Sequence, residues 1–262
     1  MKIFYKKYEL IFVLLFPLVV FILTFFLNWH INYLASLFLM FGVPSLFLSF
    51  QNKEKVSKIT KFSLMVSIPI AFIFELVSFG DQSWTVPQSM LPWRLFGFIP
   101  FEDLLWQFFT VYLIIMFYEC FCRQKFQPLL FNRIKIMNVL LYSAMVIVML
   151  IFTLNNSLIS PSYAFLWLGL IFFPIQIIIF LFRRPDLVRP LIKVQIFFFY
   201  LHTMFELIGI KWSHWLFPGK HYIGWVNILS MHFPLEEFIF VMCIGAMAAC
   251  VYYEYFANKR YL

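Results

Sequence analysis

Charged side chains are scarce in this chain. Asp, Glu, Lys and Arg make up 12% of its 262 residues, whereas 63% are hydrophobic and 23% aromatic. Soluble domains carry about one quarter charged residues, so this composition excludes a soluble globular domain. The apolar runs that remain are typical of membrane spans, because about 20 residues cross a bilayer. We therefore predict an all-α integral membrane protein.

Glycine and known metal-binding patterns are also sparse, and their absence excludes several chemistries. The chain has 8 glycines and no glycine-rich phosphate or dinucleotide loop, so we expect no nucleotide cofactor. It lacks a His-x-x-x-His pair, which argues against a membrane di-iron site, and we predict no metal. Four histidines near the ends of the spans are interpreted as membrane-interface residues: His202, His214, His221 and His232.

Eight apolar segments reach about spanning length. They run approximately over 10–28, 31–50, 62–79, 99–121, 136–155, 163–182, 191–210 and 233–256. If the N-terminus is cytoplasmic, 17 of the 20 Lys and Arg residues fall on the cytoplasmic side. This is the positive-inside pattern of a multi-pass membrane protein. We therefore expect both termini to be cytoplasmic, and we attribute the net charge of +8 to topology and contact with the lipid bilayer, not to nucleic acid. The lysine-rich start, which no small-residue cleavage site follows, is expected to be a retained signal-anchor.

One acidic pattern occurs twice. Its first part, Phe-Glu-Leu followed by Trp and Pro, contains Glu75 and Trp84 and recurs at a constant offset with Glu206 and Trp215. Its second part is a proline followed by two adjacent acids, and it recurs at a slightly longer offset, because the connecting loop is longer in the second copy. This part consists of Pro100, Glu102 and Asp103 in the first copy and of Pro234, Glu236 and Glu237 in the second.

The repeat predicts the organisation of the whole chain. The same shift places the first four spans on the last four, and an even number of spans gives both copies one orientation. We predict two parallel four-helix repeats, related by an axis along the membrane normal. The first occupies 1–122, a cytoplasmic linker follows at 123–135, and the second repeat occupies 136–262.

Six carboxyl groups of the repeated pattern are candidate catalytic residues, because a charge in hydrocarbon costs at least about 2.5–3.5 kcal/mol. The predicted membrane topology places all six at one depth, near the outer boundary of the bilayer: Glu75, Glu102, Asp103, Glu206, Glu236 and Glu237. Glu75 and Glu206 lie close to the negative ends of their helices, so we expect them to remain protonated, and the first-turn acids to ionise more readily. The alternatives are helix-start chemistry for the first-turn acids and interhelical hydrogen bonds for the other two.

Aromatic residues also repeat with the acids. Trp84 and Trp215 are either interface-belt residues or an aromatic face that stabilises a passing carbocation. Near the cytoplasmic ends, Tyr-Glu at 118–119 recurs at 253–254. We interpret these two pairs as anchors at the ends of their spans.

The repeated motifs resemble the small integral-membrane lycopene cyclases, a carotenoid cyclase family that occurs as paired subunits or as a fused tandem. That domain carries an acid late in one span, a loop with Trp and Pro, and Pro-Leu-Glu-Glu at the start of the next span. The resemblance covers about 50 residues in each half of this chain. The family usually has Trp-Asp where this chain has Phe-Glu at 74–75 and 205–206.

The resemblance implies a redox-neutral, acid-initiated cyclisation of the end group of a linear carotenoid such as lycopene, with no cofactor. It implies that Glu75 or Glu206 is the acid, and that Glu102 or Glu236 is the base or a charge that stabilises the cation. Trp84, Trp215, Pro100 and Pro234 would contact the substrate, a polyene dissolved in the bacterial inner membrane. Carotenoid-pathway enzymes or a second copy of the chain are further expected partners.

Other functions remain open. Parallel repeats with intramembrane acids are also typical of a proton-coupled secondary transporter. The spans show no conspicuous Gly or Pro interruption at their centres, which argues against a transporter. The remaining alternatives are a cyclase of a different terpenoid or polyene and a binding protein on an inactive cyclase scaffold.

Overall fold

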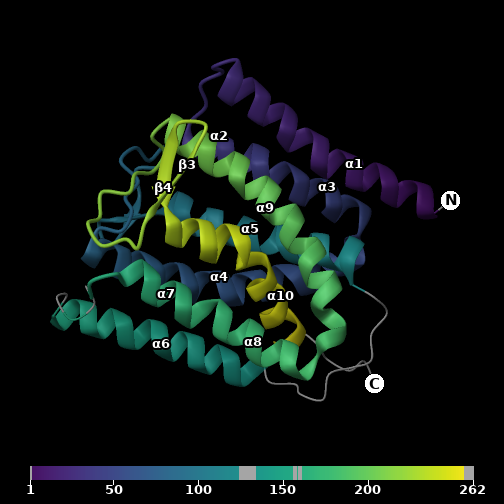
Figure 1. Ribbon diagram of the computed structural model, residues 1–262. Helices are drawn as coiled ribbons and strands as arrows, with labels where there is room; N and C mark the ends of the chain where they lie inside the picture. The colour runs from purple at the N-terminus through teal and green to yellow at the C-terminus, as the bar shows by residue number, and fades with distance from the viewer. Residues whose placement is uncertain (1, 124–133, 156–157, 159–160, 257–262) are drawn as a thin grey trace.

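The computed structural model describes residues 2–123, 134–155, 158 and 161–256. Within them the chain forms a helical bundle with two short β-hairpins at one end (Figure 1). Helix α1 begins and helix α10 ends at the opposite end of the bundle (Figure 1). The predicted linker at 123–135 lies almost entirely outside the described residues.

The described part of the first half contains five α-helices and one hairpin. Its elements are α1 (Lys2–Phe21), η1 (Ile22–Phe26), α2 (Tyr33–Leu37), η2 (Phe38–Gly42), α3 (Val43–Gln51), α4 (Lys53–Asp81), β1 (Arg94–Leu95), β2 (Ile99–Pro100), α5 (Phe101–Phe117) and η3 (Tyr118–Cys122). The side chain of Asn32 accepts a hydrogen bond from the Ala35 amide and so caps the start of α2. Extended backbone at Pro100 ends the hairpin and starts α5, so the two adjacent acids fall in its first turn.

The second half follows the same order. Its elements are α6 (Ile134–Leu154), α7 (Ala164–Phe172), α8 (Pro174–Arg183), η5 (Pro185–Leu187), α9 (Val188–Lys211), β3 (Trp225–Ile228), β4 (Met231–Pro234), η6 (Glu237–Cys243) and α10 (Gly245–Phe256). Both hairpins are antiparallel, and each precedes the helix that carries two adjacent acids. Helix α2 begins at Tyr33 and α7 at Ala164, which the repeat places at equivalent positions.

The helices confirm the prediction of an all-α, multi-pass membrane protein. Seven helices of the described chain are long and apolar enough to cross a membrane, or eight if the bent pair η6 and α10 counts as one span. The two members of that pair, Glu237–Cys243 and Gly245–Tyr255, meet at 47°. The segment predicted as the eighth span is therefore not one straight helix.

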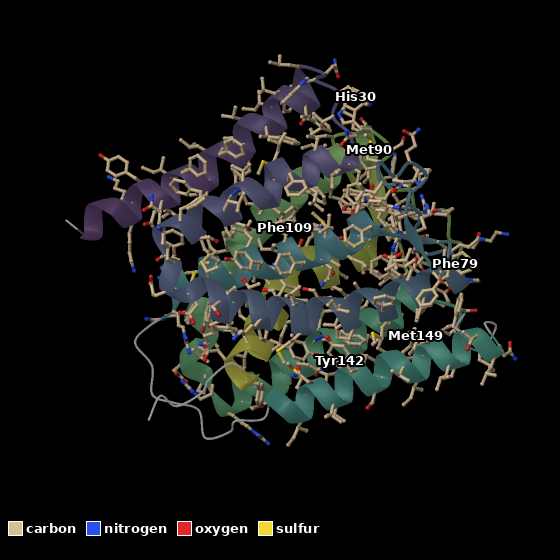
Figure 2. All side chains as sticks on the ribbon, turned by 180° about the vertical axis from the view of Figure 1, so that it is seen from behind. His30, Phe79, Met90, Phe109, Tyr142 and Met149 are labelled. Carbon is tan, nitrogen blue, oxygen red and sulfur yellow. The ribbon has the colours of Figure 1, made fainter. Side chains whose placement is uncertain are left out.

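The outer faces of the bundle are apolar. Figure 2 shows side chains projecting outward along α1 and α6. Exposed aliphatic residues on these two helices include Ile11, Leu15, Val19, Val139, Leu140, Ile147 and Leu150. An apolar surface of this extent requires a lipid or protein environment.

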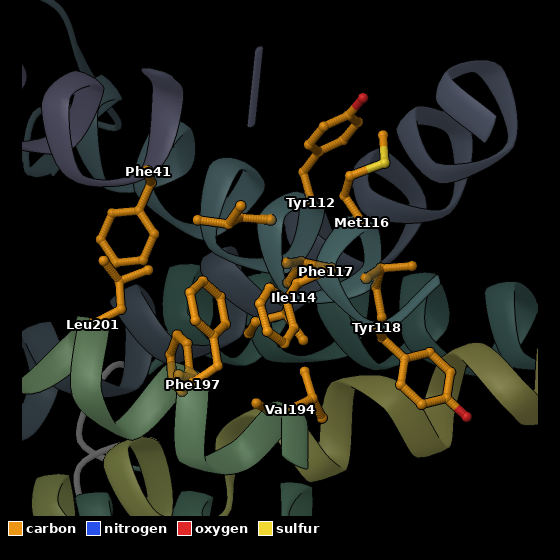
Figure 3. Packing of buried hydrophobic residues seen from close by; sticks show 14 of the residues in the cluster. Phe41, Tyr112, Ile114, Met116, Phe117, Tyr118, Val194, Phe197 and Leu201 are labelled. Atoms are coloured by element: carbon orange, nitrogen blue, oxygen red, sulfur yellow. The ribbon is translucent and has the colours of Figure 1, made fainter. Parts of the chain in front are cut away.

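The core forms where α5 packs against α9. The rings of Phe117 and Phe197 stack with centroids 3.8 Å apart and an interplanar angle of 3°. Figure 3 shows Ile114 and Val194 near these rings and Leu201 beside Phe41, and each of the three is at most 2% exposed. This contact joins the last helix of the first half to a helix of the second.

Contacts at both ends of the bundle join the two halves. At the hairpin end, Thr85 and Leu216 occupy equivalent positions of the repeat, and each backbone N–H donates to the other's carbonyl, at 2.9 and 2.8 Å. At the other end, the Tyr253 hydroxyl donates to Glu119 Oε1 at 2.5 Å, and Arg123 pairs with both Glu119 and Glu254. The bridge between Thr85 and Leu216 therefore pairs two positions that the sequence repeat makes equivalent.

This ionic cluster corrects the interpretation of the Tyr-Glu pairs as simple span-end anchors. Glu254 is fully buried, and its Oε1 lies 2.9 Å from Arg123 Nε. The side chain of Glu119 is 11% exposed, and Lys58 lies 3.8 Å from its Oε1. The cluster is therefore part of the contact between the two halves.

Candidate active site

A cavity of about 150 Å³ lies between the two halves of the bundle, below the hairpins. Four of the six predicted acids line it: Glu75 from α4, Asp103 from α5, Glu206 from α9 and Glu237 from η6. The chain therefore brings two carboxyl groups from each half to one space.

A tryptophan holds the first acid of each half in place. Trp84 Nε1 donates to Glu75 Oε1 at 3.1 Å, and Trp215 Nε1 donates to Glu206 Oε1 at 2.9 Å. Donor and acceptor have the same sequence separation in both halves, because the chain turns back over the end of the helix that carries the acid. Both tryptophans line the cavity, and their contact with a substrate stays a prediction.

Different residues allow the two tryptophans to approach their helices. On α4, the Ser78 side chain accepts a hydrogen bond from the Trp84 amide and donates one to the Trp84 carbonyl. On α9 the residue at the equivalent position is Gly209, and a Cβ atom there would lie 2.1 Å from the Trp215 ring. Close approach of the indole therefore requires glycine at 209.

We expect Gly209→Ala to displace Trp215 and to break its bond to Glu206. Overpacking of this kind costs about 1–3 kcal/mol. Tryptophan fluorescence and the thermal unfolding midpoint of the purified protein measure both effects. Ser78→Ala is the matched control: it removes a hydrogen bond without adding volume, and it should shift the midpoint less. A Gly209→Ala protein with the parent spectrum and midpoint would contradict this packing.

The other acid of each doublet turns away from the cavity. Glu102 accepts hydrogen bonds from the Leu91 amide at 2.8 Å and from Ser89 Oγ at 2.7 Å. Glu236 accepts one from the Ile223 amide at 2.7 Å. Both side chains are buried, and neither lines the cavity. They tie the loops to the helix starts, so the base role that the resemblance implied for them does not fit their positions.

The two prolines of the motif also lie outside the cavity wall. Pro100 pairs with Arg94 in one hairpin, and Pro234 pairs with Trp225 in the other. Neither residue is part of the cavity lining. Their place at the end of a strand and the start of a helix corrects the expectation that they contact substrate.

The two cavity acids of the first half, Glu75 and Asp103, face the same space from α4 and α5. The Tyr33 hydroxyl of α2 donates to Asp103 Oδ1 at 2.8 Å. Sequence reasoning missed Tyr33, because no motif links α2 to the acids of α4 and α5.

The second half places an imidazole between its two acids. His202 Nε2 lies 3.0 Å from Glu237 Oε1 and 3.8 Å from Glu206 Oε2. His202 is 1% exposed, so its interpretation as an interface residue is wrong. The spacing His-x-x-x-Glu places its side chain on the same helix face as Glu206, and this signal could have found it.

These three residues are also the one set in the described chain that could hold a metal ion. Ligand atoms of His202, Glu206 and Glu237 all lie within 4.8 Å of one another. An imidazole and two carboxylates would suit zinc or another first-row divalent metal. His202 Nε2 and Glu237 Oε1 also lie within hydrogen-bonding distance of each other, at 3.0 Å.

His214 is a further exception among the predicted interface histidines. It lies in the loop after α9 and is 4% exposed, with Nε2 2.9 Å from the Ile31 carbonyl oxygen. Burial lowers its pKa. His214 therefore joins the second-half loop to the start of α2.

Aromatic rings form much of the remaining cavity wall. They include Phe74, Phe165, Phe172, Phe173, Phe198 and Phe205. A cavity of about 150 Å³ with apolar walls is large enough for one benzene-sized ring. The space therefore suits a six-carbon end group better than a whole polyene.

Comparisons with protein families, with characterised proteins and with solved structures found no significant match.

Proposed function

We propose that the protein is a cofactor-independent carotenoid cyclase, an isomerase that closes a ring at the end of a linear polyene such as lycopene. The observation that carries this proposal is the cavity itself, in which four carboxyl groups and two tryptophans face an apolar, aromatic space. A hydrocarbon offers no polar group for recognition, so shape, apolar contact and aromatic faces must bind it.

The chemistry needs a proton donor, a protected cation and a proton acceptor. A buried carboxylic acid protonates the terminal double bond, a neighbouring double bond attacks the cation, and a carboxylate removes a proton to form the new alkene. Electron balance requires no oxidant or reductant. The rings of Trp84 and Trp215 favour the cation by about 0.5–2 kcal/mol each through cation–π attraction.

The organisation proposed for the molecule is a pair of parallel four-helix repeats with both termini in the cytoplasm of a bacterium. Three features support the repeat: the bridge between Thr85 and Leu216, the two Trp–Glu bonds, and the loop amides held by Glu102 and Glu236. The distribution of Lys and Arg supports the topology. In this orientation the cavity lies near the outer face of the inner membrane, and substrate enters from the bilayer.

Production of the chain in cells that accumulate lycopene tests the proposal. We expect cyclised carotenoid in the pigment extract, resolved by chromatography and absorption spectroscopy. Cells that carry a chain with all four cavity acids changed to Asn or Gln are the control. A lycopene pool unchanged by the parent chain, with the protein present in the membrane, would contradict the proposal for this substrate.

The bent last span favours a second candidate, a proton-coupled transporter. Broken helices beside acidic residues form the substrate and ion sites of many transporters, and the 47° bend follows directly after the segment that begins at Glu237. A transporter would move protons across the membrane of a sealed vesicle when its solute is added. The cyclase proposal expects ring formation in detergent, where no membrane separates two compartments.

A further inference from the structure

The second half of the cavity brings one imidazole and two carboxyl groups together. His202 and Glu206 lie one turn apart on α9 and share a face of that helix, and Glu237 is the first residue of η6. His202 Nε2 lies 3.0 Å from Glu237 Oε1 and 3.8 Å from Glu206 Oε2, and ligand atoms of all three lie within 4.8 Å of one another. Bonds from zinc to imidazole nitrogen or carboxylate oxygen are about 2.0–2.2 Å long. Small side-chain rotations therefore bring all three groups onto one ion.

The first half does not repeat this donor set. The repeat places Ala71 of α4 at the position of His202, and Ala71 also lines the cavity. The first half therefore offers Glu75 and Asp103 without an imidazole, and Asp103 Oδ1 accepts the hydroxyl of Tyr33. Imidazole favours transition metals, whereas carboxylates alone suit magnesium and calcium. Of the two halves, the second has the donors of a transition-metal site.

The cavity supplies no fixed cation to its acids. Four carboxyl groups face it, and the described residues of its wall include no Lys and no Arg. At the opposite end of the bundle, by contrast, Arg123 pairs with both Glu119 and Glu254. Burial of a carboxylate is costly unless a cation or hydrogen bonds compensate it. A divalent ion in the second half supplies the charge that the cavity wall lacks.

The surroundings of the three groups suit a bound ion. Trp215 Nε1 donates to Glu206 Oε1 at 2.9 Å, and hydrogen bonds of this kind orient the carboxylate ligands of metal sites. The rings of Phe198 and Phe205 lie 5.1 and 6.1 Å from the His202 ring, measured between centroids. The three groups are therefore oriented from behind and shielded from bulk water.

We propose that His202, Glu206 and Glu237 bind one divalent transition-metal ion, zinc fitting best, and that the bound ion inhibits the enzyme. The site stands on the geometry of the three groups, and the inhibition rests on the proposed cyclisation. That reaction needs a carboxylate in the cavity that is free to remove a proton. A bound ion occupies both carboxylates of the second half, so the chain cyclises its substrate without the ion and stops when zinc binds.

Metal analysis of the purified protein tests the site. The protein is stripped with a chelator in detergent, equilibrated with Zn²⁺ or Mg²⁺, freed of unbound ion and measured by inductively coupled plasma mass spectrometry. We expect one zinc per chain and no retained magnesium, because imidazole suits zinc and not magnesium. The thermal unfolding midpoint should rise with zinc concentration, since an ion that binds the folded state alone stabilises it.

Ligand variants separate this site from adventitious binding. His202→Gln and Glu206→Gln should each weaken zinc binding about tenfold or more, at least the loss that follows removal of an outer-shell partner. Glu75→Gln is the matched control, the same change as Glu206→Gln at the equivalent position of the first half, and should keep one zinc. The exposed His221, 3.3 Å from Asp81, is a surface competitor.

Three results would overturn the site. The first is a parent chain that binds no zinc, and the second is zinc retained in both His202→Gln and Glu206→Gln. The third is a zinc that is lost equally in Glu75→Gln. Zinc that disappears in His221→Gln and persists in the ligand variants is the second result, with the ion on the surface.

Ring formation with and without zinc tests the inhibition. In membranes supplied with lycopene, saturating Zn²⁺ should lower the rate about tenfold or more, since a general base contributes about 10²–10⁴-fold, and a chelator should restore it. An unchanged or higher rate in protein that holds one zinc per chain would overturn the inhibition. If the parent chain forms no ring with or without zinc, the proposed function and the inhibition both fail, whereas the zinc content still decides the site.

Discussion

Glu75→Gln is expected to lower the rate of ring formation by about 10²–10⁴-fold, the range in which a single general acid contributes. Glutamine keeps the size of the side chain and can still accept the bond from Trp84 Nε1. It has no acidic proton to give, so the loss isolates the chemistry from the packing. The measurement is the initial rate of cyclised product in membranes supplied with lycopene.

The matched control for this prediction is Glu102→Gln. Glu102 is equally part of the repeated motif, but it accepts its bonds from Ser89 and the Leu91 amide and does not line the cavity. An amide oxygen can accept the same bonds, so ring formation should remain within a few-fold of the parent. A Glu102→Gln variant as inactive as Glu75→Gln would show that the position of an acid, inside or outside the cavity lining, does not determine its function.

Arg123→Met is expected to produce the largest loss of stability. Arg123 lies between Glu119 and the fully buried Glu254, and methionine would remove the cation from Glu254 and leave Glu119 with Lys58 at 3.8 Å. Removal of one partner from a buried ion pair typically costs about 3–5 kcal/mol. We expect a lower thermal unfolding midpoint in detergent and less protein in the membrane.

A surface ion pair provides the comparison. Arg184 pairs with Asp186, whose side chain is 53% exposed, and exposed pairs contribute about 0–1 kcal/mol. Arg184→Met should therefore change the midpoint much less than Arg123→Met. Equal shifts for the two variants would mean that the buried cluster does not hold the halves together.

Much of the fold could be predicted from apolar run length alone. The predicted spans coincide with the helices because about 20 apolar residues must cross the bilayer as one helix. The bend in the last span was missed although it lies beside Gly245, near the centre of the predicted span 233–256, because a single glycine is common in membrane helices and does not by itself indicate a break. A π-helical segment of this kind leaves no clear compositional signal.

The site was only half predictable. All four acids that line the cavity could be identified from the repeated pattern and from the cost of burying a charge. Neither argument could show that Asp103 faces the cavity and Glu102 does not, or that Glu237 faces it and Glu236 does not. Adjacent helical residues point about 100° apart, so the rotation of the helix decides which one faces inward. The hydrogen bonds from Leu91 and Ile223 report that rotation, and they depend on loop geometry.

The partners of the acids depend on tertiary contacts. Tyr33 reaches Asp103 from a distant part of the sequence, and no local pattern records this contact. His202 stands in the first position of a His-x-x-x-Glu spacing, yet its burial follows from the packing of α9 against the rest of the bundle. Sequence periodicity alone therefore treats it like any histidine near a membrane interface.

The central claim is that the two halves build one active site. The most direct test is the rate of ring formation by Glu237→Gln, in which every acid of the first half remains intact. One shared site predicts that almost no cyclised product forms, a fall of about 10²-fold or more. A variant that retains half of the parent rate would contradict the claim by indicating two independent sites, and one that retains the full rate would confine the chemistry to the first half.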